Sequence, residues 1–443
     1  MTENLSPSDV LTMRMRALGL ARAGVAGAVE AGPGAVEAGP GAVDAGPGTV
    51  AWPAGSGLAD PAQPGSAQRT ASESAPSGAE RIANVARRML AVQGQDWRSA
   101  RWALGVRAPG TTISDVEAAF AERRIVRSWP MRGTVHIVSA DDIGWMQGAT
   151  NHRVLAGAPK RRAYLGMSDA VLDRLVETSL AALAASRGLD RDQLATHWTE
   201  AGIEWQSNWR YHVIWWLCQN GLAVFGPVGS SGEPLLVRAD EWIMRPRLLE
   251  GDAALAELAT RYSRARGPVR ATDFAWWSGL TVREARHAIA LASDAGELVE
   301  ARALDDAGAP VAGASGVLWV DPELLGSGAT MAPGEVPEWQ LLAAFDEHLL
   351  GYSERAPQLD PAHFERIVPG RNGMFLATVV QRGRVVGTWK RRRAAGGGID
   401  VTPLPGEHVE TRGVEPAATE WARFHCLEAQ PVRLAQEGEI EDE

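Results

Sequence analysis

The chain has 443 residues, 45% of them hydrophobic, which is enough for several small domains or one composite body with an ample core. Its two cysteines are too few for a disulfide framework or a cysteine-rich metal site, so we expect reduced thiols and no bound metal. The beginning of the chain lacks the basic and apolar regions of a signal peptide, and no apolar run approaches the roughly 20 residues needed to span a bilayer. We therefore expect a cytoplasmic protein without membrane contact.

The formal net charge of −10 argues at first against a nucleic-acid partner, because neutralising phosphates requires clustered cations. The distribution of charge reopens the question. Basic residues cluster at 160–162, 261–270 and 382–393, while acidic residues gather in the tail at 437–443. Each basic cluster is either a solvated face or a phosphate-binding surface, and the sequence leaves both interpretations open.

The first predicted helix begins at a start signal, Ser6 to Asp9, and apolar residues continue at helical spacing to Ala21. Residues 28–48 then repeat the unit Ala-Val-Glu/Asp-Ala-Gly-Pro-Gly, and small polar residues follow to about residue 78. A Gly-Pro-Gly in every unit is incompatible with a helix, and the Gly-X-Y period of collagen is absent. We predict a disordered insertion at about 22–78 that interrupts the first domain.

The stretch from Met89 to Val138 predicts a helix ending in Val-Gln-Gly-Gln-Asp-Trp at 92–97, two further helical segments, and a hairpin. The hairpin is indicated by alternating apolar and polar residues on both sides of a turn at 130–133. Three helices followed by a hairpin is the order of a winged helix, a common nucleic-acid reader. Arginine, aromatic and hydroxyl side chains on the hairpin are candidates for contacting DNA: Arg127, Trp129, Arg132, Thr134 and His136. For Trp129 and His136 a buried core position is the alternative.

The same order recurs twice, in passages that begin near residues 188 and 267. Each passage has a glycine-bounded helix, a second helix at 208–219 or 282–292, and then a glycine and a strand. Beyond residue 330, an amphipathic stretch at 338–350 precedes strands separated by glycine-rich turns. We predict an α+β fold of three tandem winged-helix units and a C-terminal β-rich domain with an acidic tail; the expected boundaries are 1–150, 151–245, 246–330 and 331–443.

Two further groups of residues have mainly structural interpretations. The pairs Trp215-Trp216 and Trp276-Trp277 lie in apolar helical segments, so we predict that they belong to the core. The run Asp346-Glu347-His348 offers two carboxylates and an imidazole, as a metal site would. Consecutive residues point to different faces of a helix, however, so a shared metal is not expected.

Four stretches of the sequence resemble the AlkZ-like winged-helix DNA glycosylases, which excise bulky alkylated bases and unhook interstrand cross-links. They are Gln-Gly-Gln-Asp at 93–96, Trp-Pro-Met-Arg-Gly-Thr-Val-His at 129–136, Asp-Phe-Ala-Trp-Trp-Ser-Gly-Leu at 273–280, and Phe-Asp-Glu-His-Leu-Leu-Gly-Tyr at 345–352 with Gly-Thr-Trp at 387–389 behind it. The resemblance implies that Gln93 and Gln95 are the catalytic pair, with Asp96 as an electrostatic helper of lower standing. The family usually has an aliphatic residue between the two polar ones, where this chain has Gly94.

Hydrolysis of an N-glycosidic bond requires an attacking water, and two glutamine amides can hold one water because each amide both donates and accepts. Without the resemblance, Gln93 and Gln95 would be ordinary polar residues at a helix terminus. A glycosylase that also cleaves the strand forms a Schiff base through an amine, and this chain offers only Lys160, Lys390 and its amino terminus, none beside the glutamines. A monofunctional, water-using enzyme without a cofactor fits better.

The sequence thus predicts a monomeric DNA glycosylase that acts on bulky N7-alkylguanine lesions in double-stranded DNA and is associated with the nucleoid. The resemblance suggests two further roles, the unhooking of interstrand cross-links and self-resistance to DNA-alkylating natural products. The alternative is a winged-helix DNA-binding protein or regulator without catalysis.

Overall fold

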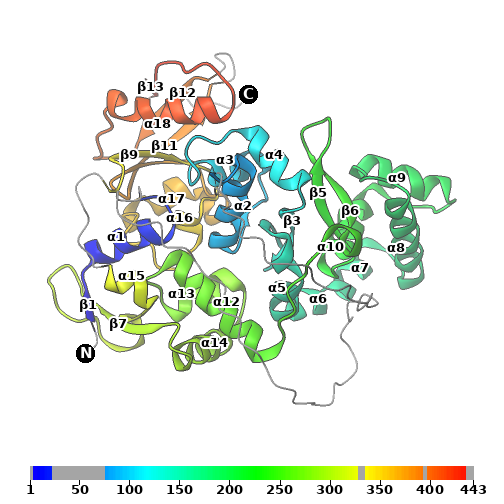
Figure 1. Ribbon diagram of the computed structural model, residues 1–443, viewed down its shortest axis with the longest axis horizontal. Helices are drawn as coiled ribbons and strands as arrows, with labels where there is room; N and C mark the ends of the chain where they lie inside the picture. The colour runs from blue at the N-terminus through cyan, green and yellow to red at the C-terminus, as the bar shows by residue number, and fades with distance from the viewer. Residues whose placement is uncertain (1–2, 22–74, 328–334, 393–396, 436–443) are drawn as a thin grey trace, which may run out of the picture. The chain divides into compact units, whose positions relative to one another are not determined.

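The computed structural model describes residues 3–21, 75–327, 335–392 and 397–435, which contain helices and three β-sheets (Figure 1). Most of the insertion predicted at 22–78, and the acidic tail, lie outside the described residues. Among the helices described, none is both long and apolar enough to cross a membrane. Short 3₁₀ turns connect several elements, at Ala140–Asp142, Ser207–Trp209, Gly313–Gly316, Pro361–His363 and Pro369–Arg371.

The first group of elements has helices followed by a hairpin, as predicted. Its members are α2 (Gly78–Met89), β2 (Val92–Gln93), α3 (Trp97–Gly105), α4 (Ile113–Ala121), β3 (Ile125–Met131), β4 (Thr134–Ser139) and α5 (Ile143–Thr150). A capping box at Ser77 and Glu80 starts α2. Arg132 and Gly133 both have positive φ, as a two-residue turn that matches the twist of the strands requires. One prediction was wrong: the helix ends at Met89, and the Gln-Gly-Gln run begins in a strand.

The second group repeats this order and shares a sheet with the first. It comprises α6 (His152–Ala156), α7 (Ala158–Leu165), α8 (Asp169–Ala184), α9 (Arg191–Glu200), α10 (Arg210–Gln219), β5 (Ala223–Val228), β6 (Pro234–Arg238) and α11 (Ala239–Trp242). Helix α8 starts after Ser168, whose side chain accepts a hydrogen bond from the Val171 amide. Strand β3 pairs with β5 through Arg127 and Phe225, so both hairpins belong to one sheet in the order β2-β4-β3-β5-β6.

The third group consists of α12 (Gly251–Arg266), α13 (Ala271–Ser278), α14 (Val282–Asp294), β7 (Val299–Ala303), β8 (Val317–Val320) and α15 (Pro322–Gly326). The N-terminal elements β1 (Glu3–Leu5) and α1 (Pro7–Ala17) pack here: β1 pairs in parallel with β7, and Val10 and Met13 join its core. The sequence assigned these N-terminal residues to the first unit. All three groups have the element order of a winged helix, and their assignment to three winged-helix units stays a prediction.

The C-terminal part is built on a five-stranded sheet in the order β13-β12-β11-β10-β9. Its elements are β9 (Trp339–Leu342), α16 (Glu347–Leu350), α17 (Phe364–Ile367), β10 (Thr378–Gln381), β11 (Arg384–Arg391), β12 (Ile399–Pro403), α18 (Thr411–Phe424) and β13 (Arg433–Leu434). The amphipathic stretch at 338–350 is therefore divided between a strand and a short helix. Helix α18 packs against this sheet, with its Trp421 ring 5.7 Å from that of Trp389 on β11 (Figure 1).

The paired tryptophans were predicted to be buried, and only one of the four is fully so. Trp277 is 0% exposed and packs beside Tyr262, whereas its neighbour Trp276 is 45% exposed. Trp215 and Trp216 are half-buried. The core prediction is thus wrong for Trp276, because two adjacent residues of a helix face directions about 100° apart and only one of these directions points into the core.

Candidate active site

The Gln-Gly-Gln run lies along the edge of the shared sheet, where β2 pairs with β4. Gln93 is opposite His136, and the Gly94 amide donates to the Val135 carbonyl oxygen at 2.8 Å. From the other strand of the hairpin, Arg127 Nε donates to the Gly94 carbonyl oxygen at 2.9 Å. The hairpin therefore holds the backbone of this run from two strands, which limits its freedom despite the glycine.

The two candidate catalytic glutamines have different surroundings. Gln93 is 8% exposed, and its buried Oε1 has no hydrogen-bond partner among the described residues. Gln95 is exposed and lies in the loop before α3. Asp96, the possible helper, caps α3 by accepting a hydrogen bond from the Ser99 amide at 2.7 Å. An acceptor oxygen without a protein partner is costly to bury, and Gln93 thus retains a free site for a hydrogen-bond donor.

Gly94 approaches β4 closely, at the position where the family usually has an aliphatic residue. A Cβ at this position would lie 3.2 Å from the Cα of His136 and 3.3 Å from the Ile137 nitrogen. These neighbours are backbone atoms of a paired strand, so relief requires β2 and β4 to move apart. The glycine permits a tighter pairing of the two strands than a larger residue would.

We expect Gly94→Ala to lower the free energy of unfolding by about 1–3 kcal/mol, the usual cost of overpacking. Chemical denaturation of the wild type and the variant would measure it. Gly148→Ala is a suitable control, because a Cβ at Gly148 on α5 meets nothing within 4 Å. If the Gly94 variant and the wild type had equal free energies of unfolding, the β4 backbone would move to accept the added methyl group without a measurable loss of stability.

A buried carboxylate, Glu347, connects β2, the strand that carries Gln93 (the glutamine strand), to the rest of the protein. Its Oε1 accepts from the Gln93 backbone amide at 3.3 Å, and its Oε2 accepts from Trp277 Nε1 at 3.0 Å and from Arg266 Nη2 at 2.7 Å. Arg266 also donates to the carbonyl oxygens of Met89 and Ala91, which lead into β2. Both side chains of the ion pair are at most 1% exposed. This pair fixes the backbone immediately before and at Gln93.

The neighbouring residues of Glu347 are held by separate partners. Asp346 accepts two hydrogen bonds from Arg107, at 2.7 and 2.8 Å, and the Nε2 of His348 lies 2.9 Å from the Gly383 carbonyl oxygen. Burial opposes ionisation of Asp346, but the Arg107 charge prevails and lowers the pKa of the carboxyl group. Among the described residues no group of histidine, cysteine and carboxylate side chains is arranged to hold a metal ion. The three residues instead anchor one segment in three directions.

His136 is a neutral histidine with a defined tautomer. Its Nδ1 lies 3.0 Å from the Thr134 carbonyl oxygen, which can only accept, and its Nε2 lies 3.4 Å from Arg132 Nη2, which can only donate. Only the form with a proton on Nδ1 and none on Nε2 satisfies both neighbours. Burial, together with the charge of Arg132, lowers the pKa of His136 well below its usual value. The residue opposite Gln93 on β4 is therefore an uncharged imidazole.

We expect the stability of the protein to decrease as pH falls below about 6.5. Burial also lowers the pKa of His348, to about 4. Unfolded chains protonate these histidines near their ordinary pKa, whereas the folded protein keeps them neutral. The two histidines therefore give their full contribution to the free energy of unfolding above the ordinary histidine pKa. This contribution is lost as pH falls toward the lowered pKa of the folded protein, and for His348 the loss is about 3 kcal/mol. Calorimetric Tm measured against pH, for the wild type and His136→Asn, would detect a flatter curve in the variant; parallel curves would contradict this.

The hairpin residues expected to contact DNA are largely covered by protein. Trp129 is 3% exposed and belongs to the core of the second group, and His136 is fully buried. Arg127 and Arg132 are half-buried, and burial lowers the pKa of both guanidinium groups. The Thr134 hydroxyl is buried without a partner among the described residues. For Trp129 and His136 the structure thus shows the core alternative, and DNA contact by the hairpin stays a prediction.

The basic clusters also differ from one another. The arginines at 261–270 form ion pairs with carboxylates of this chain: Arg261 with Asp142, Arg264 with Asp321, Arg266 with Glu347, and Arg270 with Glu354. In the cluster at 160–162, Arg162 is buried and donates to Asp169, whereas Lys160 and Arg161 are exposed on α7. The cluster at 160–162 therefore has two exposed cations that a phosphate could reach.

The sequence did not reveal the roles of Glu347 and Arg266. The available signal was a pair of acidic residues inside a segment that is otherwise apolar, since buried carboxylates need a cationic or hydrogen-bonding partner. The partner itself could not be identified, because Arg266 lies 81 residues away along the chain. Only the packing of α12 and α16 around β2 brings the two together.

Comparison with known proteins identifies the family. The family described as DNA glycosylase AlkZ-like matches residues 86–424. The chain is 25% identical to an interstrand DNA cross-link repair glycosylase of Streptomyces sahachiroi over 362 residues, which span 79% of this chain and 92% of that protein. The structure resembles that of the Streptomyces sahachiroi DNA glycosylase AlkZ with a TM-score of 0.68 and 22% identity, covering 98% of this chain and all of the other. The matched region contains the glutamine strand, the β3–β4 hairpin and the segment at 345–352 that carries Glu347 (the Glu347 segment). This chain therefore belongs to the AlkZ-like DNA glycosylase family.

Proposed function

We propose that this protein hydrolyses the N-glycosidic bond of bulky N7-alkylguanines in double-stranded DNA, and that it unhooks interstrand cross-links made through such bonds. The observation that supports this most directly is the buried amide oxygen of Gln93, which has no hydrogen-bond partner among the described residues. It lies on a strand held by an ion pair and a hairpin. Family membership supplies the reaction class. The name of the Streptomyces relative supports the extension to cross-links.

The chemistry requires little of the enzyme, because N7-alkylation gives guanine a positive charge. When the bond between the sugar C1′ and the base N9 breaks, its electron pair goes to the base and neutralises that charge. A water oxygen then bonds to C1′ and releases a proton to solvent. Gln93 Oε1 can accept a hydrogen bond from this water and thereby orient its lone pair toward C1′. We expect Gln95, which is exposed in the same run, to contact the DNA or the same water.

We also propose that the enzyme is monofunctional and acts as a monomer without a cofactor. Cleavage of the strand through a Schiff base would require an amine at the site. Lys160 lies on α7 and Lys390 on β11, so neither belongs to β2, the hairpin or the Glu347 segment. We further propose self-resistance to DNA-alkylating natural products as its role, since such compounds form bulky lesions of this kind.

Incubation of the purified protein with a duplex carrying one N7-alkylguanine tests the reaction. Excision leaves an abasic site, which alkali converts to a strand break at the lesion. A cross-linked duplex in a denaturing gel tests unhooking, and borohydride in the reaction tests for a Schiff base, which we expect to be absent. Tight binding without any abasic product would instead identify a DNA-binding protein without catalysis.

A further inference from the structure

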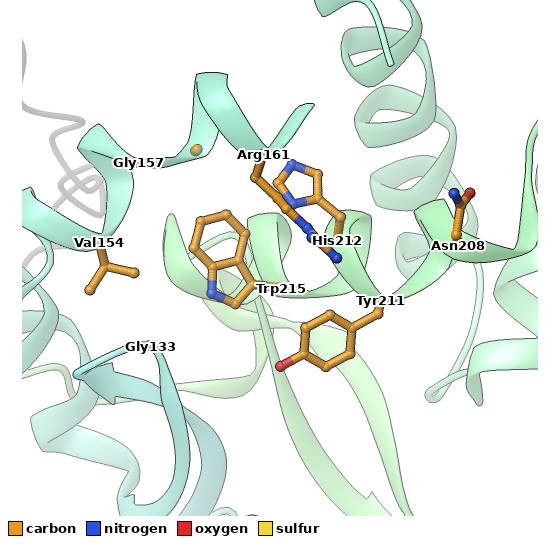
Figure 2. Close-up of a pocket in the computed structure, with 9 residues that line it drawn as sticks. Gly133, Val154, Gly157, Arg161, Asn208, Tyr211, His212 and Trp215 are labelled. Carbon is orange, nitrogen blue, oxygen red and sulfur yellow. The ribbon is translucent and has the colours of Figure 1, made fainter. Parts of the chain in front are cut away.

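A cavity of about 390 Å³ lies beside the tip of the β3–β4 hairpin (Figure 2). One wall is formed by Tyr211 and Trp215, which are one turn apart on α10 and therefore share a face. Figure 2 shows their rings side by side, with Gly133 of the hairpin turn across from Trp215. Gly157, between α6 and α7, belongs to the opposite side. The cavity thus has aromatic rings on one side, and the other side combines these glycines with the Val154 side chain.

The aromatic wall is held in place before any ligand binds. The His212 ring stacks on Trp215, with centroids 5.2 Å apart and planes 25° apart, and the Tyr211 ring meets Trp129 edge-on at 6.2 Å. His212 is 4% exposed, and its Nε2 has no hydrogen-bond partner among the described residues. A fixed aromatic surface with a buried, unpaired imidazole nitrogen is suited to a flat ligand that carries polar edges.

The electrostatic character of the cavity favours an anionic ligand. Arg161 lines it from α7, and Lys160 beside Arg161 is also exposed. The chain as a whole has a net charge of −10, so an exposed pair of cations next to an aromatic wall is a local feature. A flat aromatic group linked to an anion is the chemical description of a nucleotide, and stacking surfaces combined with cations are how proteins bind unpaired nucleotides.

We propose that this cavity binds one nucleotide displaced from the DNA duplex, its base against Tyr211 and Trp215 and its phosphate near Arg161. The inference rests on the proposed function, because a glycosylase acts on a nucleotide within a duplex. Gly133 precedes His136 by three residues, a distance of about 10 Å along a strand. A nucleotide in the cavity would therefore hold the DNA close to the hairpin that supports Gln93.

The test compares two unmodified probes, a short duplex and the same duplex with one extra unpaired adenine. Because neither probe contains a lesion, the measurement is independent of excision. We expect the wild type to bind the bulged duplex roughly 10-fold more tightly, as one stacked base would give. Trp215→Leu should lose this preference and keep its affinity for the intact duplex. Trp276→Leu is the matched control, since Trp276 is a 45% exposed tryptophan on α13 and does not line the cavity.

A second variant is needed in case Trp215→Leu does not fold, because Trp215 also packs against the core of the second group. Gly157→Leu fills the cavity from the opposite side; Gly157 has a negative φ, and a Cβ there would be 3.5 Å from its nearest neighbour, the Val154 carbonyl oxygen. We expect this variant to lose the preference too. Arg161→Ala should reduce the slope of log affinity against log salt by about 0.9, unlike Arg174→Ala on α8, which lies away from the cavity.

The proposal is overturned if the wild type binds both probes equally, or if folded Gly157→Leu or Trp215→Leu retains the preference. These outcomes are separable from failure of the proposed reaction. Loss of the preference in the variants, with no excision of N7-alkylguanine by the wild type, would support the cavity and reject the reaction. Excision by a wild type that binds both probes equally would support the reaction and reject the cavity.

Discussion

Gln93→Ala is expected to slow excision of an N7-alkylguanine by about 10²–10⁴-fold, while DNA affinity changes only a few-fold. Gln93 is nearly buried, and its side-chain oxygen has no partner in the part of the chain that the structure describes, so its loss removes a group that positions water and little surface that meets DNA. We expect a loss in the same range for Gln95→Ala. Single-turnover rates and separate binding curves would distinguish the two quantities.

The double variant gives a sharper result than either single one. If both amides hold the same water, removing the second should cost much less than removing the first, because the water is already free. Gln206→Ala is the matched control, since Gln206 is an exposed glutamine in the second group. Full activity in both single variants would reject the catalytic assignment. Equal losses of rate and affinity would make these glutamines DNA contacts.

Arg266→Ala is expected to have the largest effect on stability, about 3–5 kcal/mol in the free energy of unfolding. The change leaves Glu347 as a buried carboxylate without its cation, and it removes the donors to two backbone carbonyl oxygens before β2. Glu347→Gln keeps the shape and an acceptor for the Gln93 amide, so we expect a smaller loss of stability. Calorimetric Tm and denaturant midpoints would measure both variants.

A surface pair provides the comparison for this prediction. Arg382 and Glu338 are 3.0 Å apart, with side chains 73% and 56% exposed. Arg382→Ala should therefore cost about 1 kcal/mol or less. Because Glu347 acts on Gln93 only through the backbone, it is a positioning residue, and Glu347→Gln should reduce the excision rate less than Gln93→Ala does. A Tm of Arg266→Ala equal to that of Arg382→Ala would show that the buried pair is not needed to hold β2.

Local signals explain why much of the helical structure could be predicted. The helix start at Ser6 and the hairpin around Arg132 and Gly133 each depend on residues within a few positions of one another. The family could also be recognised, because its motifs are contiguous and span most of the chain. Predicting these features does not require knowing which distant segments pack against them.

The tertiary structure decided the features that depend on distant partners. Gln93 lies in a two-residue strand only because β4, more than 40 residues later, pairs with it, and no local signal specifies so short a strand. The first strand pairs with β7 through Glu3 and Ala301, which no sequence period records. The burial of Trp129 and His136 likewise depends on which elements cover the hairpin. Local sequence thus determined many of the helices, the hairpin and the family, while packing between distant segments determined the short strands and which of the named side chains are buried or paired.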